Sequence, residues 1–140
     1  MASLRQGRNG NGIHYWAFLA NPLMYRIEDA VRELDVDTWT TKGSDVAAGD
    51  RVLIWKAKGG DPVRGIVALG EVLTDPVPMA GESPFWVNPA SGRAVENRVR
   101  IRYVRPSGLP LWLEDPANAI LRELSVSRAT GGTVFHMTPE

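Results

Sequence analysis

The sequence contains no cysteine, and this absence excludes several kinds of chemistry. Disulfide bonds, thiol nucleophiles and cysteine-based zinc sites all need the missing side chain. A cysteine-free composition is also typical of a reducing compartment, so we expect a cytoplasmic protein. A chain of 140 residues buries roughly 68–70% of its unfolded surface, which is enough for a core without covalent or metal staples. We therefore expect a single domain over residues 1–140.

Long apolar runs are also missing. No run approaches the ~18 residues that a membrane helix requires. The first twelve residues are rich in Arg, Asn and Gly, so they do not form a signal peptide, and we expect them to be flexible. The expected protein is a monomer without a membrane partner.

Catalytic groups are scarce. The two histidines, His14 and His136, are far apart in the sequence, and neither is next to a serine nucleophile pattern. No glycine-rich phosphate loop precedes a predicted helix, and no spacing of carboxylates and histidines resembles a metal site. Glu71 is a single acid without a partner nearby in the sequence. These gaps predict a protein that is not an enzyme and that carries no cofactor or metal.

Net charge is absent as well, because sixteen basic residues balance sixteen acidic ones. The distribution is uneven. The segment Arg26–Asp37 has two arginines against five acids, whereas Arg93–Arg105 has five arginines against Glu96 alone. A neutral protein with such a basic strip can hold a phosphate backbone locally. The alternative interpretation is a solvated strand face.

Periodicity predicts the elements along the chain. Apolar residues from Ile27 to Leu34 follow the i, i+3, i+4, i+7 spacing of an amphipathic helix. Two apolar runs around the Gly59-Gly60 loop predict a β-hairpin. Between Arg98 and Val104, arginines alternate with apolar residues, which predicts a half-buried strand with an arginine face. A first strand and a last strand are predicted at residues 14–20 and 133–137. The apolar residues between Leu111 and Leu124 predict a short helix after Asp115-Pro116.

This order of elements predicts an α/β (α+β) fold built on a small mixed, mostly antiparallel sheet. Few helices are available to cover the sheet. We therefore expect it to close into a small β-barrel with flanking helices.

Five tryptophans are the strongest positive signal. Trp16 and Trp112 have apolar neighbours and are expected in the core. Trp39 follows the predicted helix in a threonine-rich stretch without apolar periodicity, so we expect it outside the core, lining a pocket for a flat ligand. Trp55 at a strand end and Trp86 in a polar loop could complete this pocket, because stacking tolerates any π-face. The alternative places Trp55 in the core and makes Trp86 a surface anchor.

Aromatic, glycine and polar residues scattered over residues 14–138 follow a recognisable pattern. It comprises Tyr15-Trp16-Ala17-Phe18, Asn21-Pro22, Tyr25, Trp39, Gly49-Asp50, Ile54-Trp55-Lys56, Gly65-Ile66, Gly70-Glu71-Val72, Leu124-Ser125-Val126 and Gly132-Thr133-Val134-Phe135. This pattern resembles the EVE domain of the PUA-like superfamily, which is related to YTH and ASCH domains.

The resemblance implies a PUA-like barrel with a pocket for a flipped-out, modified base. In YTH relatives an aromatic cage holds a methylated base of RNA. Trp39-Thr40 matches the position of one wall, Trp86 is the candidate for the second, and Asn21 matches a base-contacting position. The expected pocket residues are Trp39, Thr40, Asn21, Tyr25, Trp55 and Trp86. The cations available for phosphate are Arg98, Arg100, Arg102, Lys56, Lys58 and Arg128.

The implied partner is DNA or RNA that carries a modified base. Bacterial EVE domains also occur fused to nucleases, where the resemblance implies recognition of modified cytosine such as 5-methylcytosine. The sequence leaves open whether the base is cytosine or adenine. It also leaves open whether the chain acts alone or belongs with a nuclease. A second hypothesis is a small-molecule-binding domain or minor enzyme that uses the same pocket.

Overall fold

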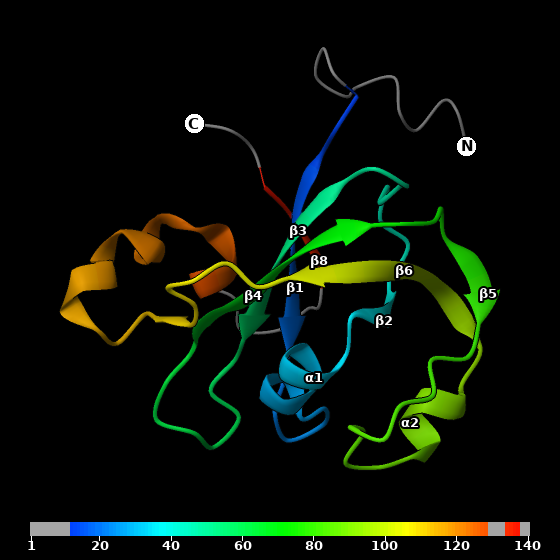
Figure 1. Cartoon of the computed structure of the whole chain (residues 1–140), viewed down its shortest axis with the longest axis horizontal. Helices are drawn as coiled ribbons and strands as arrows, with labels where there is room; N and C mark the ends of the chain where they lie inside the picture. Colours follow the sequence, from blue (N-terminus) through cyan, green and yellow to red (C-terminus); the bar gives the residue numbers. More distant parts are fainter. Residues whose placement is uncertain (1–11, 129–133, 138–140) are drawn as a thin grey trace.

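A computed structural model of the chain describes residues 12–128 and 134–137 (Figure 1). The strands are β1 (Tyr15–Ala20), β2 (Val36–Thr40), β3 (Arg51–Lys56), β4 (Gly65–Val72), β5 (Val77–Met79), β6 (Glu96–Val104), β7 (Leu111–Trp112) and β8 (Val134–Met137). The helices are α1 (Ile27–Glu33) and α2 (Ala90–Arg93), and the 3-10 helices are η2 (Pro116–Glu123) and η3 (Ser125–Arg128). The predicted flexible segment, residues 1–12, lies outside the described residues except for Gly12.

The described strands form one eight-stranded sheet whose main path is β2-β6-β4-β3-β1-β8. β5 pairs with β6, and β7 pairs with β4. Only β1 and β3 run parallel among the described pairs, and the others are antiparallel. The predicted mixed, mostly antiparallel α+β fold is therefore confirmed.

The predicted closure into a barrel is wrong, because the sheet of the described residues ends at β2 and β8 without pairing these strands. Bulky aromatic rings fill the space between the two halves of the curved sheet. Phe18 on β1 and Trp39 on β2 have ring centroids 5.4 Å apart. Side-chain packing therefore joins the two halves of the curved sheet, and no backbone ladder is needed to do so.

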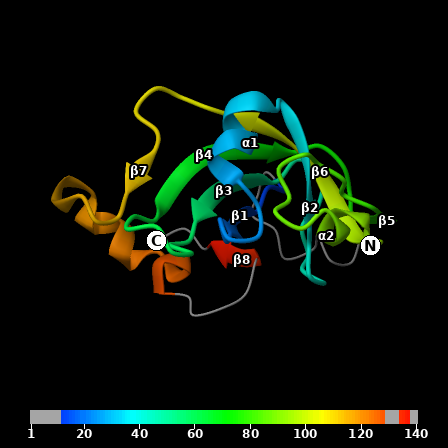
Figure 2. The same ribbon diagram turned by 90° about the horizontal axis from the view of Figure 1, so that it is seen from below.

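The two faces of the sheet carry separate apolar clusters. On the inner face, Phe18 and Ile54 pack with Ile27 of α1. On the outer face, Trp55 packs with Leu121 of η2 and its neighbours. Figures 1 and 2 place η2 and η3 at one end of the molecule, and α2 and β5 at the opposite end. No helix in the described ranges is both long enough and apolar enough to cross a lipid bilayer.

The hairpin and the first helix are confirmed. β3 and β4 pair from Arg51↔Glu71 to Lys56↔Gly65, with a bulge after Ile54. α1 follows the predicted apolar spacing, and its buried residues face the inner cluster.

The helix predicted after Asp115-Pro116 is present as the 3-10 helix η2, and β7 precedes it. β7 adds to β4 because Gly65 has no side chain, and a Cβ there would lie 1.9 Å from the Leu111 carbonyl oxygen. Asp115 then accepts a hydrogen bond from the Ala117 amide and starts η2.

Trp39 also departs from its prediction. It lies in β2, where Asp37 and Trp39 point inward and Thr38 points outward. The indole is 7% exposed and belongs to the inner cluster. Its Nε1 donates to the Tyr103 hydroxyl at 3.0 Å, so burial leaves no unpaired donor. The threonine-rich stretch follows a period of two, which is the pattern of a half-buried strand.

Replacing Trp39 with Ala should therefore unfold the protein more easily. We expect a loss of about 3–5 kcal/mol in the free energy of unfolding, because a buried ring leaves a cavity. Trp16→Ala, at another buried ring of the same cluster, should cost a similar amount. Urea unfolding measures both, and a wild-type midpoint for Trp39→Ala would contradict its place in the core.

Candidate nucleic-acid interface

Residues 80–95, called the Trp86 loop here, connect β5 to β6 and fold against the turn before α1. The Arg26 amide donates to the Phe85 carbonyl at 2.8 Å, and the Val87 amide donates to the Met24 carbonyl at 3.0 Å. Trp86 and Tyr25 form an isolated antiparallel bridge. These backbone contacts join segments about sixty residues apart in the sequence.

Two glycines let the Trp86 loop fold tightly. The Trp86 Nε1 donates to the Gly81 carbonyl at 2.7 Å, and the Gly81 amide donates to the Gly92 carbonyl at 2.8 Å. A Cβ on Gly92 would lie 2.5 Å from the Trp86 Nε1. The indole is therefore fixed in orientation by a glycine that leaves room for it.

An aromatic group lies where the Trp86 loop meets α1. The rings of Tyr25 and Trp86 have centroids 4.6 Å apart, and Phe85 meets Tyr25 edge-on. Tyr25 and Phe85 are buried, whereas Trp86 is half-buried. Arg26 is exposed and places its guanidinium 5.4 Å from the Phe85 ring centroid. Trp86 is thus partly exposed and follows Phe85, over whose ring the Arg26 cation lies.

A buried carboxyl group lies beneath this aromatic group. Asp37 accepts hydrogen bonds from the hydroxyls of Tyr25 at 2.8 Å and Tyr103 at 2.6 Å. Its other oxygen accepts from the Thr38 amide at 2.8 Å. The Tyr25 hydroxyl also lies 2.9 Å from the Ser83 hydroxyl in the Trp86 loop. One polar network therefore connects β2, β6, the turn before α1 and the Trp86 loop.

Burial shifts the proton affinities of this network. Burial raises the pKa of Asp37, although hydrogen bonds from Tyr103, Tyr25 and Thr38 and the positive charge of Arg98 oppose the change. Burial, followed by the nearby Asp37 charge, also raises the pKa of Tyr25 and of Tyr103. The tyrosines therefore act as hydrogen-bond donors and not as acids at ordinary pH.

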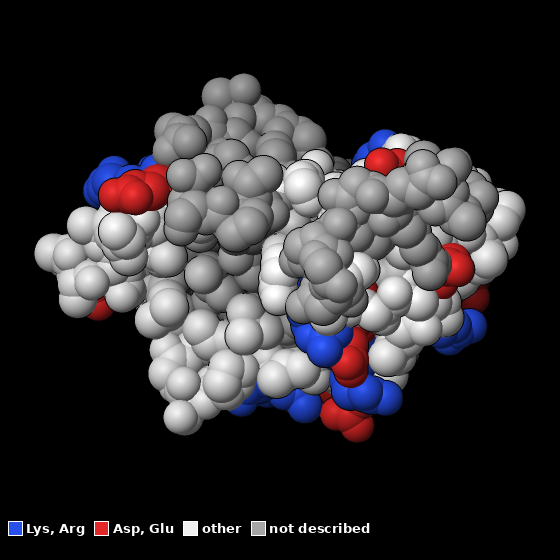
Figure 3. All heavy atoms as spheres, turned by 90° about the horizontal axis from the view of Figure 1, so that it is seen from above, with Lys and Arg blue, Asp and Glu red and all other residues white. Residues whose placement is uncertain are grey.

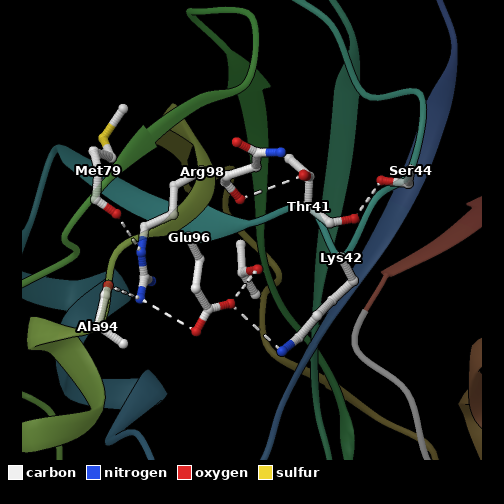
Figure 4. A network of polar contacts seen from close by, with 9 residues as sticks. Thr41, Lys42, Ser44, Met79, Ala94, Glu96 and Arg98 are labelled. Carbon is white, nitrogen blue, oxygen red and sulfur yellow. Dashed lines mark hydrogen bonds and ion pairs between the residues drawn. The ribbon is translucent and has the colours of Figure 1, made fainter.

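Arg98 is held at the outer side of the same region (Figure 4). Its guanidinium donates to the carbonyls of Met79 at 3.1 Å and Ala94 at 3.2 Å, and it lies 3.8 Å from the Glu96 carboxylate. A hydrogen bond from Thr40 lowers the pKa of Glu96, and nearby Lys42 and Arg98 add to this effect. Arg98 therefore ties both ends of the Trp86 loop together.

The sequence matches the EVE domain family over residues 14–140. The chain belongs to this family. EVE domains have a PUA-like fold that is generally associated with nucleic-acid binding, and they are generally binding modules rather than catalysts.

Two solved structures resemble this EVE domain. One is a hypothetical protein from Leishmania major, with a TM-score of 0.56 and 16% identity over 90% of this chain and 87% of its own. The other is a protein from Pseudomonas putida, with a TM-score of 0.56 and 16% identity over 89% of this chain and 92% of its own. At this identity the likeness shows the fold alone. Among curated proteins, none matches the sequence.

The structure brings together only part of the predicted pocket of this EVE domain. Tyr25 contacts Trp86, and Trp39 joins them through Tyr103 and Asp37. Trp55 is 1% exposed in the outer cluster, on the opposite face of the sheet.

Two polar pocket candidates have local partners. The Asn21 side chain accepts from the Leu23 amide at 2.9 Å and so stabilises the turn before α1. Thr40 donates to Glu96 at 3.0 Å on the outer side of β2. Neither contacts the rings of the Trp86 loop through a described hydrogen bond.

The cations predicted to bind phosphate differ in their exposure to solvent. Arg98 is buried, and so is Lys56, whose Nζ donates to the Val63 carbonyl at 2.9 Å and lies 2.9 Å from Asp61. Arg100, Arg102 and Lys58 are exposed, and the side chain of Arg128 lies outside the described part of the chain. Figure 3 shows basic and acidic groups next to one another on one face, and the described residues visible there form no broad area of a single sign.

Several relevant residues were missed by sequence reasoning. Asp37 and Tyr103 could have been found from the period of two in β2 and β6, which turns both inward. Arg93 is exposed directly after Gly92, which packs on Trp86, and only the folded loop reveals this. His14 and His136 also meet, with ring centroids 4.8 Å apart, because β8 pairs with β1.

Protonation of Asp37 gives the first prediction for this site. Its pKa is higher in the folded chain than the usual 3.8, so the folded state binds more protons and the free energy of unfolding falls as pH rises. Relative to Asp37→Asn, we expect the wild type to lose stability as pH rises from below 3.8 through the raised pKa. Urea unfolding across pH measures this difference. Glu123→Gln, at an exposed carboxylate, is the control. A constant difference between wild type and Asp37→Asn would contradict the prediction.

Gly92 provides a second prediction. In Gly92→Ala, the new Cβ would lie 2.5 Å from the Trp86 Nε1 and 2.8 Å from the Gly81 carbonyl oxygen, so the indole must move. We expect the Trp86 indole N–H signal in an NMR spectrum to shift, while the Trp16 signal stays in place. Ser91→Ala, in the same short helix, should leave both signals unchanged.

Proposed function

We propose that this EVE domain is a non-catalytic module that binds nucleic acid and stacks a methylated base on Trp86. The half-buried Trp86 ring, backed by Tyr25, is the observation that carries the proposal. A flat base needs an exposed ring, and Trp86 is half-buried next to a polar network. The proposal replaces Trp39, which is buried, by Trp86 as the accessible wall.

The energetics of base capture support this assignment. Extruding a base from a duplex costs a few kcal/mol, and stacking on an aromatic ring returns about 1–3 kcal/mol. Phosphate contacts must supply the remainder. Arg26 and Arg93 are both exposed, one directly before α1 and one in α2. Both are positioned by the same backbone contacts that hold the indole.

The polar groups near Trp86 can read the edge of a base. Ser83 is half-buried and places its hydroxyl within 2.9 Å of the Tyr25 hydroxyl. Tyr25 itself is 7% exposed, so contact between a base and Tyr25 requires the Trp86 loop to shift outward. In the proposed state the methylated base therefore stacks on the exposed part of Trp86, and the buried Tyr25 supports the ring. Apolar ring faces exclude water from the methyl group, and this favours the modified base.

The proposal assigns binding alone to this chain. We expect no hydrolysis or group transfer by the purified domain, and a fused or associated nuclease would supply cleavage. Cytoplasmic location and a monomeric state complete the proposal. Recognition of a base within a polymer distinguishes it from a small-molecule-binding domain.

The test compares oligonucleotides with and without a methyl group, as DNA and as RNA, using 5-methylcytosine and N6-methyladenine. Trp86→Ala should weaken binding of the preferred modified oligonucleotide by roughly 1–3 kcal/mol in fluorescence anisotropy. Trp86→Phe keeps a ring and should lose less.

Trp112→Ala is the matched control, because Trp112 is also half-buried but lies in β7 at the opposite end of the sheet. Equal loss in both variants would remove Trp86 from the site. Competition by the free methylated nucleoside as strong as by the oligonucleotide would favour a small-molecule-binding domain instead.

A further inference from the structure

The outer face of the sheet is only partly covered in the described structure. The apolar cluster around Trp55 and Leu53 lies under η2 and η3. The other half carries exposed or half-exposed side chains from four central strands, which we call the open face. Its residues are Tyr15, Arg51, Leu69, Glu71, Arg100 and Arg102.

Strand register aligns these side chains in a row across the sheet. Tyr15 on β1 is opposite Arg51 on β3, Arg51 is opposite Glu71 on β4, and Glu71 is opposite Arg102 on β6. Neighbouring strands lie about 4.8 Å apart, so the row from Tyr15 to Arg102 extends roughly 14 Å. Arg100 lies two residues along β6 on the same face.

The charges of the open face do not balance. Glu71 lies 3.4 Å from the Arg51 guanidinium and 3.0 Å from that of Arg102, so one carboxylate serves two cations. Arg100 is exposed, and within residues 12–128 and 134–137 its guanidinium has no hydrogen-bonding or ion-pair partner. Three arginines against one glutamate leave the face positive. Glu71, which has no partner nearby in the sequence, is thus the link between two arginines.

An exposed ring accompanies these charges. Tyr15 is 44% exposed, and the apolar Leu69 is 38% exposed beside the row. A cationic surface with an accessible aromatic ring fits a polymer with anionic groups and planar bases. An acidic protein segment would use the cations but would have no need for the tyrosine.

The open face continues to the Trp86 loop. Arg100 is opposite Thr38 in β2. A Cβ on Gly81 would lie 2.7 Å from the Thr38 hydroxyl oxygen, so the start of the Trp86 loop lies directly on that position. A strand that follows the row from Tyr15 through Arg102 to Arg100 therefore arrives at the loop that holds Trp86.

We propose that the open face binds single-stranded nucleic acid flanking the base held at Trp86, with phosphates at Arg51, Arg102 and Arg100 and a base stacked on Tyr15. This inference rests on the proposed function for its starting point. Phosphate binding exchanges the Glu71 ion pairs for phosphate contacts. Glu71 thereby limits affinity in the free protein.

The test uses unmodified, fluorescein-labelled single-stranded oligonucleotides of DNA and RNA, titrated over a range of salt concentrations. Arg51→Gln and Arg100→Gln should each weaken binding and reduce the slope of log affinity against log salt by about 0.7. Tyr15→Ala should weaken binding by about 5- to 150-fold with an unchanged slope. Arg32→Gln in α1 removes an equal charge from the other side of the sheet and should change the slope little.

Glu71→Gln provides a gain of binding. It removes the ion pairs that Glu71 forms with Arg51 and Arg102. Affinity for the unmodified oligonucleotide should therefore rise more than in Glu123→Gln, which makes the same charge change in η2. Equal effects of the two glutamine variants, or wild-type slopes for Arg51→Gln and Arg100→Gln, would overturn the inference. If sedimentation shows a concentration-dependent dimer that Tyr15→Ala dissociates, the open face binds a second copy of the chain. If oligoglutamate competes as strongly as the oligonucleotide, the open face binds an acidic protein.

Modified oligonucleotides separate the two proposals. If the open-face variants weaken all oligonucleotides equally while the preference for the methylated base persists, both proposals stand. If the preference persists and the open-face variants bind like the wild type, only this inference fails. If the open-face variants weaken binding but methylation has no effect in any variant, the inference stands and the proposed function fails.

Discussion

The hydrogen-bonded carboxyl group of Asp37 is the constraint on which the site depends. An ionised carboxylate in an apolar interior is costly, and this one is tolerated because Tyr25, Tyr103 and the Thr38 amide all donate to it. The three donors come from the turn before α1, from β6 and from β2. Their convergence fixes Tyr25, and Tyr25 in turn supports the Trp86 ring. Asp37 therefore helps to position Trp86, the residue that we propose to contact the base, without contacting the base itself.

The curved sheet separates two kinds of surface. Its inner face is filled by rings such as Phe18 and Trp39, so the edges approach through packing and the sheet stays open. Its outer face is divided between the cluster under η2 and η3 and the open face with its shared Glu71. The Trp86 loop crosses from one side to the other at Thr38 and Gly81. The proposed base site and the proposed path of the polymer therefore meet at Thr38 and Gly81.

Family membership identifies the fold, whereas the roles of individual residues depend on the contacts in this chain. The EVE match over residues 14–140 establishes the family, and the two solved structures at 16% identity are similar to this chain in fold. A fold hosts many functions, so the assignment of particular residues has to come from this chain. Here the position expected for one cage wall, Trp39, is a core residue bonded to Tyr103. The accessible ring belongs to Trp86, which extends from a loop whose shape depends on Gly81 and Gly92.

The sequence by itself determined the elements whose signal is local. The period of two turned Val99, Ile101 and Tyr103 inward in β6, the period of 3.6 defined α1, and the two apolar runs around Gly59-Gly60 defined the β3–β4 hairpin. These patterns are readable because side-chain direction follows from backbone geometry over a few residues. Tertiary structure decided which of these faces meet. It buried Arg98 and Lys56, moved Trp55 to the outer cluster and brought Arg51, Glu71 and Arg102 into one row. Such pairings join residues tens of positions apart, and strand order and loop closure, which no local period encodes, determine them.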